Sequence, residues 1–84
     1  MVGSMSDLVS PRTRGRIVRA IMAGRPAQAT RRGIEMHFEV SDQPTLEGDR
    51  IAWRARIRRH WYGGKASTVF AAIEEIERQA DTPR

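Results

Sequence analysis

The chain has 84 residues, no cysteine and a formal net charge of +5, with 39% hydrophobic and 30% charged residues. This length gives one small domain with a single core, and the lack of cysteine excludes disulfides, thiolate nucleophiles and zinc–thiolate sites. The chain has fourteen arginines and one lysine. The guanidinium group binds phosphate well, so this composition favours a negatively charged partner; a GC-rich genome would also produce an arginine bias, but it would not explain the net charge.

The two ends of the chain lack a periodic pattern. We expect residues 1–9 to form a disordered N-terminal segment, in which a second methionine, Met5, resembles a cloning remnant. Residues 10–80 are predicted to form one small α+β domain, and residues 81–84 a C-terminal tail. No apolar run approaches the roughly 18 residues that a membrane span needs, and no signal-peptide pattern is apparent. We therefore expect a cytoplasmic protein with no membrane partner.

Residues 10–24 carry the signals of a helix. Ser10 is a candidate N-cap, Pro11 suits the first helical position, and Gly24 marks the end. One side of this helix is apolar, and the other side carries three arginines within about 60° of one another. These residues, which we call the arginine ridge, are Arg12, Arg16 and Arg19. No acidic residue lies three or four positions away to compensate them, so the ridge favours an anionic partner.

Two strands are predicted after a linker. Residues 25–33 form the linker and end in the basic pair Arg31 and Arg32 before Gly33. Residues 34–41 alternate apolar and polar side chains, which indicates a strand with one buried face. After a turn-rich connection, residues 50–62 alternate in the same way. The side expected to face the core contains Ile51, Trp53, Ala55 and Ile57, and the side expected to face solvent contains Arg54, Arg56, Arg58, His60 and Tyr62.

Residues 69–80 are predicted to form a second amphipathic helix, after Gly63 and Gly64 and a cap at Ser67 or Thr68. The predicted fold is α+β in the order helix, strand, strand, helix, with both helices on one face of an antiparallel hairpin. The second strand is longer than the first, so part of its edge lacks a partner in the chain. We expect this part to pair with a second copy, which would give a four-stranded sheet across a homodimer.

The solvent side of the second strand is a candidate phosphate contact. Its side chains would be spaced about 6.6–7 Å apart, which resembles the spacing of phosphates along a nucleic-acid strand. Glu35 and Glu39 of the first strand are expected on the same face and could instead neutralise the arginines. Trp61 is expected at the edge of the core, where it could stack on a base or anchor a protein interface. Lys65 follows the glycine pair, whose backbone amides could hold one phosphate, although turn geometry is the simpler explanation of the pair.

These features give three hypotheses. The first is a small basic nucleic-acid-binding or regulatory protein that contacts the phosphate backbone of DNA or RNA. The second is an interaction module or inhibitor that docks on an acidic protein surface. The third is a metal-independent ribonuclease, for which the expected solvent face offers the ingredients Glu35, His37, Glu39, Arg54, Arg56, His60 and Tyr62.

We expect a binding protein rather than an enzyme, and we assign no catalytic residue. The two histidines lack the spacing of metal ligands and the chain has no cofactor motif, so neither a metal nor a cofactor is expected. The predicted nucleic-acid contacts are Arg12, Arg16, Arg19, Arg31, Arg32, Arg54, Arg56, Arg58, His60, Tyr62 and Lys65.

Overall fold

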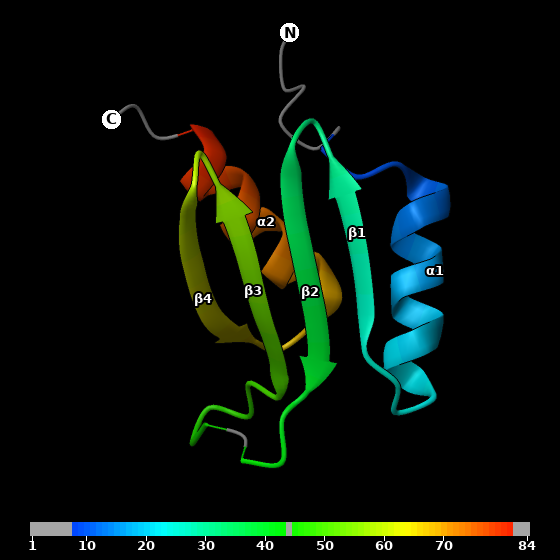
Figure 1. The fold of residues 1–84 in the computed structure, drawn as a ribbon. Helices are drawn as coiled ribbons and strands as arrows, with labels where there is room; N and C mark the ends of the chain where they lie inside the picture. Colours follow the sequence, from blue (N-terminus) through cyan, green and yellow to red (C-terminus); the bar gives the residue numbers. More distant parts are fainter. Residues whose placement is uncertain (1–7, 44, 82–84) are drawn as a thin grey trace, which may run out of the picture.

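Figure 1 shows the computed structural model of the protein, in which residues 8–43 and 45–81 are described. Two helices enclose four strands in chain order: α1 (Pro11–Met22), β1 (Ala27–Arg31), β2 (Ile34–Val40), β3 (Ile51–Ile57), β4 (His60–Ala66) and α2 (Val69–Asp81). The strands form one antiparallel sheet in the order β1-β2-β3-β4, so each strand pairs with the next one along the chain. Within the described residues, neither helix is long and apolar enough to cross a membrane.

The α+β class predicted from the sequence is confirmed, but the hairpin dimer is wrong. All four strands come from a single chain. The segment Ala27–Arg31, predicted as a linker, is a strand that pairs with β2. The predicted long strand 50–62 is two strands, β3 and β4, which pair with each other. The part of the predicted second strand that was expected to pair with a second copy therefore pairs within the same chain.

The turn between β3 and β4 consists of Arg58 and Arg59, whose φ angles are 51° and 71°. Two-residue hairpin turns of this kind need positive φ at both positions, and Asn-Gly or Asp-Gly pairs usually provide them. An Arg-Arg pair is not a typical turn sequence, so the alternation of residues 50–62 gives no indication of a turn at these positions. The β1–β2 turn at Arg32 and Gly33 also has positive φ angles, 55° and 77°.

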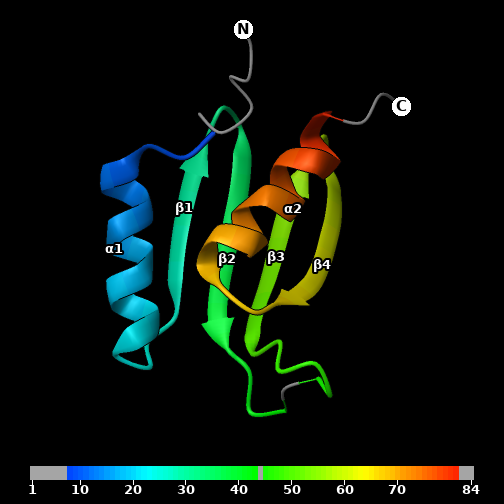
Figure 2. The same cartoon turned by 180° about the vertical axis from the view of Figure 1, so that it is seen from behind.

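The two helices bury one side of the sheet. Figures 1 and 2 show α2 crossing this side and α1 lying alongside β1 at the edge of the sheet. The Nη2 atom of Arg16 donates a hydrogen bond to the carbonyl oxygen of Gln28, 3.3 Å away, which ties α1 to the outer edge of β1. The largest fully buried side chains are Phe38, Ile17, Met36 and Ile76, so α1, β2 and α2 all contribute to one core. The opposite side of the sheet, which neither helix covers, is called the open face below.

The predicted ends of α1 and α2 are largely correct. The Oγ atom of Ser10 accepts a hydrogen bond from the backbone N–H of Thr13, as expected of an N-cap. The Oγ1 atom of Thr68 accepts a similar bond from Ala71 at the start of α2.

The domain extends slightly beyond the boundaries expected from the sequence. Leu8 and Val9, which the sequence placed in a disordered segment, are only 5% and 2% exposed and belong to the core. Residues 1–7 of that segment lie outside the described residues. At the other end, α2 includes Asp81, and the rest of the expected tail lies outside the described residues.

Candidate nucleic-acid interface

The open face is assembled by the register of the four strands. Residues that pair directly across an antiparallel sheet point to the same side. One such row runs through Gln28, His37, Arg54 and Gly63, one from each strand. The adjacent row contains Thr30, Glu35, Arg56 and Trp61. A third row contains Glu39, Ala52 and Lys65.

Trp61 is the most distinctive side chain of the open face, because it is a large aromatic residue that is 51% exposed. Its ring centroid lies 5.9 Å from that of His37, with the two planes inclined by 40°. The guanidinium carbon of Arg54 lies over the indole, 5.1 Å from its centroid, in a cation–π contact. Trp61 is thus flanked by a histidine and an arginine on the open face.

His37 also contacts a carboxylate. Its Nε2 atom lies 2.7 Å from Oε2 of Glu35, two residues earlier on β2. The alternative in which Glu35 and Glu39 pair with the arginines is not realised as ion pairs: within 8–43 and 45–81, neither Arg54 nor Arg56 forms a salt bridge with them. The two glutamates do lie on the open face opposite Arg56 and Ala52, so they still lower its net charge.

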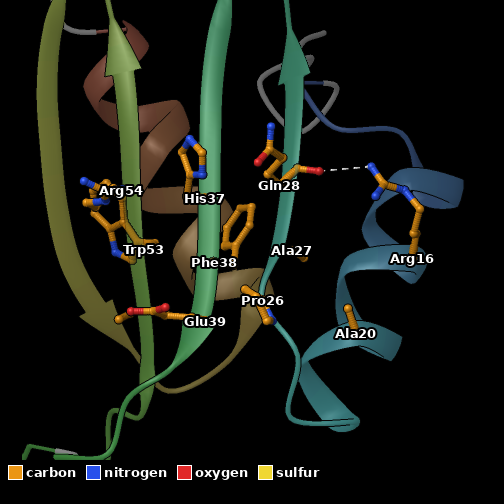
Figure 3. A pocket seen from close by; sticks show the side chains of 11 residues that line it. Arg16, Ala20, Pro26, Ala27, Gln28, His37, Phe38, Glu39, Trp53 and Arg54 are labelled. Atoms are coloured by element: carbon orange, nitrogen blue, oxygen red, sulfur yellow. Dashed lines mark hydrogen bonds between the residues drawn. The ribbon is translucent and has the colours of Figure 1, made fainter.

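A groove of about 540 Å³ runs between α1 and the open face. Figure 3 shows Arg16 on its α1 side, Arg54 on its β3 side, and Gln28 and His37 between them. Glu39 also lines the groove and is the acidic group within it. We call this feature the arginine groove. It brings Arg16 of the arginine ridge and Arg54 of the sheet, 38 positions apart in sequence (54 − 16), to the same depression.

Two residues that the sequence placed in the basic row of the second strand, His60 and Tyr62, point to the helix side of the sheet. Tyr62 pairs with Ala55 and packs against the core, and His60 pairs with Ile57 on the same helix side. The two-residue turn changes the parity of the alternation, so that Trp61, rather than His60 and Tyr62, continues the solvent side of β3. The earlier interpretation of this segment as one strand therefore placed these three side chains on the wrong sides.

Arg58 does not lie in the predicted basic row of the open face. It lies in the β3–β4 turn and contacts α2. Its Nη1 atom donates to the carbonyl oxygen of Ala80, 3.1 Å away, and its Nη2 atom to that of Gln79, 3.4 Å away. These are carbonyl groups at the end of α2, where a cation is electrostatically favoured. Arg58 therefore holds the β3–β4 turn against the last turn of α2.

The other predicted contacts fall into three groups. Arg56 and Lys65 lie on the open face, and the Nζ atom of Lys65 donates to the carbonyl oxygen of Gln43, 2.5 Å away. Arg31 and Arg32 are exposed at the β1–β2 turn, and Arg31 pairs with Ile34, on the helix side. The remaining residues of the arginine ridge, Arg12 and Arg19, are exposed on α1.

The glycine pair has neither of the roles expected from the sequence. Gly63 and Gly64 lie inside β4, not in a turn or directly before a helix N-terminus. A Cβ atom at Gly64 would lie 3.1 Å from Cζ2 of Trp53, so a larger residue there would crowd the buried indole. Gly63 faces the open side beside Arg54, where the missing side chain leaves room.

No cluster of three or more potential metal ligands occurs among the residues that the structure describes. Comparisons with protein-family models, with curated proteins and with solved structures gave no match for this chain. Function is therefore inferred from the surface itself.

Proposed function

We propose that the protein binds nucleic acid by contacting its phosphate backbone along the arginine groove. The observation that carries this proposal is that Arg16 and Arg54 line the same groove. One arginine of α1 and one arginine of β3 thus line the same groove, with residues of β1 and β2 between them. Guanidinium groups suit this role because they bind phosphate oxygens bidentately.

The charge distribution supports an anionic ligand at this place. Residues 1–33 carry seven arginines and one aspartate, a net charge of +6 (7 − 1), whereas residues 34–63 carry five basic and five acidic groups. Within α1 four arginines occur without any acidic residue. Like charges three or four positions apart destabilise a helix, so phosphate groups in the groove would relieve this repulsion.

The proposal is tested by charge reversal on the two sides of the groove. We expect Arg16→Glu and Arg54→Glu each to weaken binding of a labelled oligonucleotide, measured by fluorescence anisotropy between about 50 and 200 mM salt. For a single strand, each lost phosphate contact should lower the magnitude of the log–log salt slope by about 0.7. Two to four contacts in the wild type correspond to a slope of about −1.4 to −2.8.

Arg59→Glu is the matched control, because it makes the same charge change at an exposed position in the β3–β4 turn, outside the residues that line the groove. Equal weakening by all three variants would mean that only net charge matters and that the groove has no special role. If the wild type binds neither DNA nor RNA at 50 mM salt, the proposal fails, and an acidic protein surface becomes the better partner.

A second candidate function rests on the contact between His37 and Glu35. The Nε2–Oε2 distance of 2.7 Å, with Arg54 beside His37, provides a base, a carboxylate that orients it and a cation for the phosphate. In metal-free cleavage of RNA, the 2′-hydroxyl gives its proton to His37 as its oxygen attacks phosphorus, the P–O5′ bond breaks, and the departing 5′-oxygen takes a proton from the protonated His37 or from water, which leaves a 2′,3′-cyclic phosphate and a 5′-hydroxyl. This candidate predicts cleavage in the presence of EDTA that His37→Ala abolishes. Intact RNA after incubation with wild type rejects it without affecting the binding proposal.

A further inference from the structure

We propose that the ligand of the arginine groove is single-stranded and that one of its unpaired bases stacks on Trp61. This inference rests on the proposed function and specifies its substrate. The base is the chemical group that Trp61 would recognise, and the phosphate is the group that Arg54 would recognise.

Trp61 is far more exposed than is usual for a tryptophan. A tryptophan side chain carries a large apolar area and is normally well buried, as Trp53 is at 5% exposure. Trp61 instead leaves 51% of its surface accessible on a sheet face that is otherwise polar. Aromatic rings exposed among basic residues are the usual means by which proteins bind unpaired bases, because every base has a π-face.

Side chains of two other strands contact Trp61. His37 and Arg54 contact the indole from β2 and β3, at 5.9 Å and 5.1 Å from its ring centroid, and so support it in place above the sheet. Gly63, which follows two positions later on the same side of β4, has no side chain to compete for the space. A base that stacks on the indole would use the ring face that Arg54 does not cover.

One residue, Arg54, connects Trp61 to the arginine groove. Arg54 contacts the indole and also lines the arginine groove, so it belongs to both surfaces. A strand with a phosphate at Arg54 would bring a neighbouring base to Trp61. In a duplex the bases are paired and stacked on one another, and their faces are inaccessible to a protein side chain. The combination of a stacking ring and a phosphate contact thus favours single strands over duplexes.

The test compares Trp61→Ala and Trp61→Phe with the wild type on three ligands of the same sequence: single-stranded RNA, single-stranded DNA and duplex DNA. We expect Trp61→Ala to weaken single-strand binding about 5- to 150-fold, the factor that corresponds to about 1–3 kcal/mol for one stacked base. Trp61→Phe should restore part of this loss, because phenylalanine keeps a smaller π-face. Duplex binding should change less than twofold.

Phe70→Ala is the matched control, because Phe70 is an aromatic residue of α2 with similar exposure, 53%, and contacts Arg14 rather than the open face. It should leave single-strand affinity unchanged. Thermal melting of each variant by circular dichroism checks that the fold is retained.

Three results would overturn the proposal. If Trp61→Ala weakens single-strand and duplex binding equally, or weakens neither of them, while Arg54→Glu still weakens binding, the protein binds nucleic acid without base stacking. If the wild type binds no nucleic acid, the proposed function fails as well. If Trp61→Ala instead converts a dimer to a monomer in sedimentation, Trp61 is an anchor of a protein interface.

Discussion

Gly64 shows how a single residue of β4 fixes the packing beneath the open face. A Cβ atom there would lie 3.1, 3.2 and 3.3 Å from Cζ2, Nε1 and Cε2 of Trp53, an indole that is buried in the core. At Gly63 the nearest contacts of a Cβ atom are 3.4 and 3.7 Å, which is ordinary packing. We therefore expect Gly64→Ala to lower the free energy of unfolding by about 1–3 kcal/mol, because buried overpacking costs this much. Gly63→Ala should change it far less.

Urea denaturation followed by far-UV circular dichroism measures this difference. The midpoint should fall for Gly64→Ala with an unchanged m-value. Equal midpoints for the two variants would mean that Trp53 shifts freely to make room.

At the scale of single residues, the sequence predicted the solvent side of β3 correctly and that of β4 wrongly. Arg54 and Arg56 lie where alternation placed them, because β3 has period-two patterning on both of its faces. Trp61 was assigned to the wrong side because the alternation was continued through Arg58 and Arg59. The length of the predicted strand was the available signal, since 13 residues far exceed the usual five or six.

At the scale of elements, the β3–β4 turn and the end of α2 stabilise each other through Arg58. Its guanidinium group donates to the carbonyl oxygens of Gln79 and Ala80. We expect Arg58→Ala to lower the free energy of unfolding by about 1 kcal/mol, from lost hydrogen bonds and a lost cation at a helix C-terminus. Nucleic-acid affinity should stay within twofold of the wild type.

The same urea titration and the anisotropy assay measure the two quantities. Arg59→Ala, at the neighbouring turn position with φ of 71°, controls for the effect of alanine in a left-handed conformation. A large loss of affinity in Arg58→Ala with unchanged stability would return Arg58 to the interface that the sequence suggested.

The elements themselves were predictable where they carry periodicity and caps. Both helices have an apolar stripe and a hydroxyl N-cap, and these signals located their starts. The segment Ala27–Arg31 was missed because it has only one buried residue, Ala29, and its small and polar side chains have weak strand preference. Its strand state follows from pairing with β2 and from the coverage of its edge by α1, which are tertiary effects.

At the scale of the whole molecule, positive charge is concentrated in α1, whereas the segment that contains α2 is slightly negative. α1 contains arginines and no acidic residue, whereas residues 64–84 carry three basic and four acidic groups, a net charge of −1 (3 − 4). This asymmetry makes the α1 side of the molecule the more positive one, which would steer the proposed anionic ligand to that side most strongly at low ionic strength. The convergence of Arg16 and Arg54 could not be predicted from the sequence, because it depends on α1 lying against β1, a strand that the sequence did not reveal.

The most direct test of the account is an NMR titration of the ¹⁵N-labelled protein with a single-stranded oligonucleotide. The two tryptophans provide an internal comparison, because the indole N–H of Trp61 lies on the open face and that of Trp53 is buried. We predict saturable shifts of the Trp61 indole signal and of the backbone amides of His37 and Arg54, a smaller shift of the buried Trp53 indole, and unchanged α2 amides. Shifts centred on α2, or no saturable shift at about 50 mM salt, would contradict a nucleic-acid interface on this face of the sheet.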